Sequence, residues 1–187
     1  MFLHGLRGDC LQKTAAAFRN VPPGGRKITR VPRVGHVAGA GGVVEQTVDF
    51  ARRMGFKKIG IATCAGLLRE SRALARVLRA NGFEVYSVAC KAGMADKSLV
   101  GIDEDCKAVG ANMCNPILQA KHLNRVGTDL NILVGLCVGH DSMFYKYAEG
   151  LTTTLVAKDR VTGHNPAAPL YQLDGYYKRL LTPAGEG

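Results

Sequence analysis

The sequence has no tryptophan, few aromatic residues and no long hydrophobic run. Aromatic side chains make up 6% of its 187 residues, which argues against the base-stacking surfaces of single-stranded nucleic-acid binders. Its longest uncharged apolar runs, near 131–139 and 150–157, are far shorter than the roughly 20 residues that a membrane-spanning helix needs. Arg7 and Asp9 stand where a signal peptide would have an apolar core. We therefore expect a cytoplasmic protein that binds neither nucleic acid nor membrane.

Acidic residues are also in the minority, with 15 Asp and Glu against 25 Lys and Arg. Residues 1–40 hold seven of the basic residues and a single acidic one, together with Pro22, Pro23 and several glycines. Because proline and glycine disfavour helices and central strands, we interpret residues 1–42 as a basic leader that is loop or partly disordered. Residues 43–187 are enough for a single domain with its own core.

Short β-rich runs alternate with segments of helical periodicity from Val43 onward. This alternation predicts an α/β fold, an open and mainly parallel sheet with helices on both faces, as in a Rossmann-like three-layer sandwich. The predicted strands are 57–63, 83–89, 129–136 and 151–157, and the predicted helices are 43–54, 67–80, 116–126, 142–148 and 167–181.

Four of the six cysteines fall at one edge of this predicted sheet. Cys64, Cys90 and Cys137 follow the first three strands, and Cys114 comes just before the helix that begins at Pro116. The carboxyl ends of parallel strands share one edge, where such folds bind ligands. No local Cys-x-x-Cys pair is present, unlike zinc ribbons and ferredoxins. Any metal site must therefore be assembled by the fold, and Cys10 and Cys106 lie outside it.

Polar residues follow the third and fourth strands at the same edge. Gly139 permits a sharp turn before His140, and Asp159, Arg160 and His164 form one loop after the last strand. Lys158, which directly follows that strand, is interpreted as a solvated turn residue. The candidate catalytic residues are Cys137, His140, Asp159, Arg160 and His164.

Several longer motifs carry a resemblance to a known family. The chain resembles an uncharacterised family described as metal-binding, domain of unknown function 1847, which occurs mainly in anaerobic bacteria and archaea. The resemblance implies metal ligation by Cys64, Cys90, Cys114 and Cys137. The motifs that carry it are Arg53–Ala62 leading to Cys64, Ala80–Val85 leading to Cys90, Met113–Ile117, Gly135–Ser142, Lys158–Val161 and Gly163–Pro166.

Three functions remain open at this point. The first is a protein in which the four cysteines hold zinc or an iron–sulfur cluster, with a redox partner or a small anionic molecule as its ligand. The second is a cofactor-independent cysteine enzyme. In one form Cys114 and Cys137 act as a thiol pair, similar to two-cysteine racemases, and in another Cys137 is a nucleophile activated by His140 or His164. The third is a non-catalytic module that binds anions through the leader and Arg160.

Overall fold

The computed structural model describes residues 41–101 and 110–182. The predicted leader therefore lies outside the described residues except for its last two positions, and so do Cys10 and Cys106. No helix in the described part of the chain combines the length and the apolar character needed to cross a bilayer.

Four parallel strands form one open sheet in the order β2-β1-β3-β4, which confirms the predicted fold class. Each strand is within two residues of its predicted bounds, because the β-rich runs are short and are flanked by turn residues. The strands are β1 (Lys58–Thr63), β2 (Glu84–Ala89), β3 (Leu130–Val134) and β4 (Leu151–Val156).

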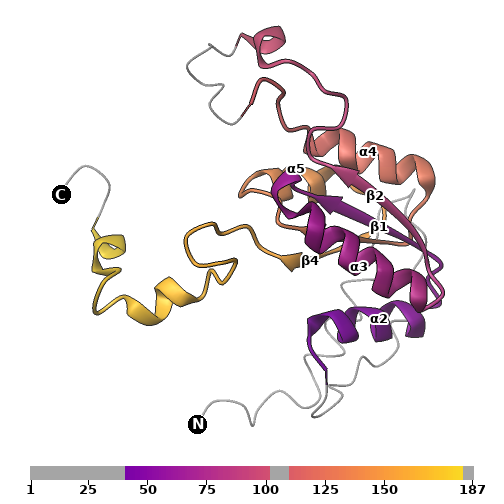
Figure 1. The fold of residues 1–187 in the computed structure, drawn as a ribbon, viewed down its shortest axis with the longest axis horizontal. Coiled ribbons are helices and arrows are strands. Elements are labelled where there is room, and N and C mark those ends of the chain that lie inside the picture. Colours follow the sequence, from indigo (N-terminus) through magenta and orange to yellow (C-terminus); the bar gives the residue numbers. More distant parts are fainter. Residues whose placement is uncertain (1–40, 102–109, 183–187) are drawn as a thin grey trace.

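The helices connect consecutive strands and cover the two faces of the sheet (Figure 1). The chain passes from β1 to β2 through α3 and then returns across β1 to β3 through α4, so the direction of winding reverses between β1 and β3. Open α/β sheets bind ligands at such a reversal, beyond the carboxyl ends of the strands. The helices are α2 (Val43–Arg53), α3 (Leu68–Ala80), α4 (Pro116–Val126) and α5 (His140–Tyr147).

The core lies on both faces of the two central strands. All five residues of β3 are buried, and so are the last five residues of β1. Leu78 of α3, Leu123 of α4 and Phe144 of α5 have no exposed surface and pack in the same cluster. Both central strands are buried on two faces, as expected for a parallel sheet covered by helices. This core fixes the ends of β1 and β3 from which the candidate site is built.

Two of the predicted helices differ in the structure. The predicted helix 167–181 is wrong: two short 3-10 helices, η5 (Ala168–Gln172) and η6 (Lys178–Leu181), stand in its place, and this segment leads away from the sheet in Figure 1. Pro169 provides no backbone N–H for a helical ladder, and Gly175 adds backbone freedom between the two turns. Helix α5 begins at His140, two residues before the predicted start, because the Asp141 carboxylate accepts hydrogen bonds from the N–H groups of Gly139 and Ser142.

Helix α4 begins with a side-chain cap that can be tested directly. The Asn115 side-chain oxygen accepts a hydrogen bond from the N–H of Leu118 at 2.9 Å. We expect Asn115→Ala to lower the free energy of unfolding by about 1 kcal/mol, the usual cost of losing an N-cap. Urea unfolding followed by circular dichroism measures the change, and Asn115→Ser, which keeps an acceptor, is the matched control. A loss as large in the serine variant would contradict the cap.

Candidate functional site

A cavity of about 990 Å³ opens at the carboxyl edge of the sheet and brings all of the predicted site residues together. Its wall comes from the turns after β1 and β2, the residues before α4 and α5, and the loop after β4. The lining residues include Cys64, Cys90, Cys114 and Cys137 together with His140, Lys158, Asp159, Arg160 and His164.

Cys64 holds the most polar position of the four thiols. Its Sγ lies 2.9 Å from the ammonium nitrogen of Lys158, and its side chain is 8% exposed. Burial by itself raises the pKa of the Cys64 thiol, but the hydrogen bonds from Lys158 and the N–H of Gly66, together with the lysine charge, outweigh burial and lower that pKa. A thiolate beside a cation is the reactive and metal-ligating form of cysteine. The surroundings of Cys64 therefore favour its thiolate form.

Cys90 lies close enough to Cys64 and Cys114 for their sulfurs to influence its pKa. The Cys90 Sγ accepts a hydrogen bond from the N–H of Ala65 at 3.3 Å, and the N–H of Asn115 donates to the Cys90 carbonyl at 2.7 Å. Burial raises the pKa of the Cys90 thiol to about 12, with the neighbouring sulfurs of Cys114 and Cys64 adding to the rise. Cys90 thus lies next to both Cys64 and Cys114, and of these three thiols Cys64 is the one whose pKa is lowered.

Cys137 and His140 enter the cavity from the turn between β3 and α5. Gly139 has a φ of 87° there, in the left-handed region that favours glycine. The turn is closed by hydrogen bonds from the N–H groups of His140 and Asp141 to the carbonyl of Cys137. Asp141 itself is used at the start of α5 and does not line the cavity.

The loop after β4 carries Asp159, Arg160 and His164 and is held by its own hydrogen bonds. The Asp159 Oδ1 accepts from the N–H groups of Val161 and Thr162. Hydrogen bonds from the Thr162 side chain and backbone lower the pKa of the Asp159 carboxyl. The N–H of Asp159 donates to His164 Nδ1 at 3.1 Å. Asp159 therefore shapes the loop that presents Arg160 and His164 to the cavity.

Sequence reasoning missed Lys158, which was interpreted as a solvated turn residue. Its ammonium group contacts Cys64 instead. The available signal was its position directly after β4, at the same edge as the cysteines. Lys91, Lys97 and Met113 also line the cavity and were not singled out.

The donor set fits a soft metal, although its side chains are not arranged around one. Four thiols at one cavity suit zinc or an iron–sulfur cluster, and N–H donors such as those of Ala65 and Gly66 are typical partners of ligating sulfurs. Across residues 41–101 and 110–182, no group of three or more His, Cys, Asp or Glu side chains is positioned to hold a metal ion.

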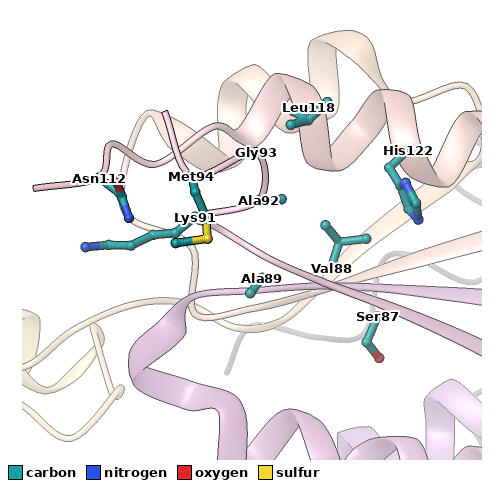
Figure 2. A pocket seen from close by; sticks show the side chains of 10 residues that line it. All are labelled: Ser87, Val88, Ala89, Lys91, Ala92, Gly93, Met94, Asn112, Leu118 and His122. Carbon is teal, nitrogen blue, oxygen red and sulfur yellow. The ribbon is translucent and has the colours of Figure 1, made fainter. Parts of the chain in front are cut away.

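A second, smaller hollow lies at the outer edge of β2 and differs in character. Figure 2 shows its lining, which includes residues of β2, the following turn and α4. Its volume is about 620 Å³. Its walls are mainly apolar, from Val88, Ala92, Met94 and Leu118, with His122 at one end. Lys91 lines both hollows. None of the four cysteines that the structure describes lines this smaller hollow.

Comparison with known proteins gives two matches. A family model described as a protein of unknown function, DUF1847, matches residues 35–155. The uncharacterized protein MJ0455 of Methanocaldococcus jannaschii is 49% identical over 138 residues, which cover 74% of this chain and 70% of that relative. The family match includes all four cysteines of the cavity and ends before the loop that carries Lys158 and His164.

Proposed function

This chain belongs to the DUF1847 family, and from the site that it carries we propose that the protein binds zinc or an iron–sulfur cluster through Cys64, Cys90, Cys114 and Cys137. The observation that carries the proposal is that one cavity is lined by all four thiols, with Cys90 next to Cys64 and Cys114. Together with Cys137 they supply four sulfur donors, the number that a closed zinc site or a cubane cluster takes.

The surroundings of the thiols support ligation in two ways. Lys158 and the backbone N–H of Gly66 favour the thiolate of Cys64, and metal ions bind the deprotonated form of cysteine. The N–H of Ala65 donates to Cys90 and orients that sulfur. The thiol of Cys90, with a pKa of about 12, would release its proton on binding metal. Bound metal would supply either a structural crosslink or an electron-accepting centre.

Metal analysis of anaerobically purified protein tests the proposal. The chelator-treated chain is reconstituted with zinc, or with iron and sulfide, and the bound metal is measured by mass spectrometry together with the visible absorption of an iron–sulfur cluster. We expect Cys64→Ser, Cys90→Ser, Cys114→Ser and Cys137→Ser each to lose most of the bound metal, because each removes a thiolate ligand. Cys10→Ser and Cys106→Ser are the matched controls. Unchanged metal content in any of the four ligand variants would contradict the proposal.

A second function is favoured by one specific contact, that between Lys158 and Cys64. An activated thiolate in an open cavity is the starting point of nucleophilic catalysis. In this alternative the nucleophile is Cys64, rather than Cys137 or the pair of Cys114 and Cys137 that the sequence suggested. Metal analysis separates the two functions when the same variants are also treated with an electrophile. A protein that binds no metal and that loses its reaction with the electrophile only in Cys64→Ser favours the nucleophile.

A further inference from the structure

We propose that the cavity also binds a small molecule with an oxyanionic group, a carboxylate or a phosphate, and that Arg160 is its principal contact. The inference rests on the proposed function, because the anion would lie beside the sulfur donors of the same cavity, and it names the class of molecule on which that site acts.

The positive charge of the cavity is the first observation. Lys158 and Arg160 come from one loop, and Lys91 and Lys97 also line the cavity. Asp159 is the single carboxylate among the described residues that line it. A cavity lined by four cationic side chains and one carboxylate attracts anions.

The availability of Arg160 is the second observation. Within the described part of the chain its guanidinium makes no ion pair, and its side chain is exposed at the mouth of the cavity. It does not pair with the adjacent Asp159, whose Oδ1 accepts hydrogen bonds from the N–H groups of Val161 and Thr162 instead. A guanidinium can donate two parallel hydrogen bonds to a carboxylate or phosphate.

His164 adds a ring nitrogen donor, because its other ring nitrogen is already used as an acceptor. The N–H of Asp159 donates to its Nδ1, so in the neutral ring the hydrogen resides on Nε2, which is left to donate to a ligand. The backbone of His164 has a φ of 69°, a conformation that costs a non-glycine residue free energy. The hydrogen bond between the His164 N–H and the Asp159 carbonyl, 2.7 Å, helps to hold this conformation.

The apolar part of the lining indicates what kind of group the ligand carries besides its oxyanion. Leu67, Val100 and Met113 also line the cavity. A volume of about 990 Å³ is at the upper end of that seen for small-molecule sites. The cavity therefore suits a small organic acid or phosphate ester with an apolar body.

Calorimetric titration of the full chain with inorganic phosphate and with succinate tests the inference. We expect binding that Arg160→Gln weakens at least tenfold and that Arg160→Lys restores in part, since one charge-assisted bidentate contact is lost. Arg125→Gln, an exposed arginine in the last turn of α4, is the matched control and is expected to change the affinity less than twofold. Absence of binding of both probes at millimolar concentration, or equal weakening in the control, would overturn the inference.

The titrations are made on metal-free and on reconstituted protein, with the metal content measured in the same samples. Phosphate or succinate binding that depends on Arg160 in a protein that takes up no metal would leave the anion inference standing and refute the metal site. Metal uptake by a protein that binds neither phosphate nor succinate would leave the metal site standing and refute the anion inference.

Discussion

Replacing Lys158 with methionine is expected to slow the alkylation of Cys64 by iodoacetamide about tenfold at pH 7 in the metal-free protein. The ammonium group lies 2.9 Å from the Cys64 Sγ, and with the N–H of Gly66 it offsets the effect of burial on the pKa of that thiol. Without the lysine, burial dominates and the pKa rises above its ordinary value. Each unit of that rise lowers the thiolate fraction about tenfold, and the greater nucleophilicity of a more basic thiolate recovers about half of the effect on a logarithmic scale.

The pH profile of the reaction separates this electrostatic role from a structural one. Because the folded-state pKa of Cys64 is lowered, the wild-type rate reaches half of its maximum below the ordinary pKa of cysteine, and the variant reaches it above that pKa. At high pH both proteins hold the thiolate, so the variant should react at least as fast as the wild type. Mass spectrometry of the peptide that contains Cys64 measures the rate, and Lys121→Met on α4 is the control. Equal profiles for wild type and Lys158→Met would refute the pairing.

The architecture could be predicted because the spacing of apolar residues distinguishes the strands from the helices. The runs that became β1 and β3 are short, apolar and bounded by turn residues, which is the pattern of strands buried on both faces. The C-terminal segment could not be predicted by the same reasoning. Its leucines and tyrosines have helical spacing, but Tyr171, Tyr176 and Leu181 are exposed in the structure. No core contact is available there to overcome the cost of Pro169 and Gly175.

The location of the candidate site could be predicted from the sequence, but the contacts among its residues could not. Parallel strands place Cys64 and Cys90 at one edge whatever the strand order, and the pairing of β1 with β2 brings the two residues together. The pairing of Cys64 with Lys158 joins residues 94 positions apart, and it depends on the lengths and turns of two loops. Likewise, Asp159 holds its own loop through Val161 and Thr162, a role that a pattern of charged residues does not distinguish from ligand binding.

The packing of a buried asparagine against a glycine at the centre of the sheet also could not be predicted from the sequence. Asn131 of β3 pairs in register with Gly60 of β1, and both lie beneath Leu123 of α4. The Asn131 side chain has no exposed surface, and its Oδ1 accepts a hydrogen bond from the Thr128 hydroxyl at 2.7 Å. Gly60 thus provides the space that the asparagine occupies, because a Cβ at position 60 would meet the Asn131 Oδ1 and would lie 2.8 Å from a methyl carbon of Leu123.

Gly60→Ala is therefore expected to lower the free energy of unfolding by about 3 kcal/mol, since one added methyl must displace two side chains that are fully buried. Urea unfolding measures the loss. Gly175→Ala is the matched control, because a Cβ there would have no neighbour nearer than 3.8 Å, and we expect a change within about 0.5 kcal/mol. The double variant Gly60→Ala/Asn131→Ala should lose at least about 1 kcal/mol less than the sum of the two single changes, because the smaller side chain removes one of the two clashes. Additive losses, or a Gly60→Ala variant as stable as the wild type, would show that the sheet and α4 are not packed in this register.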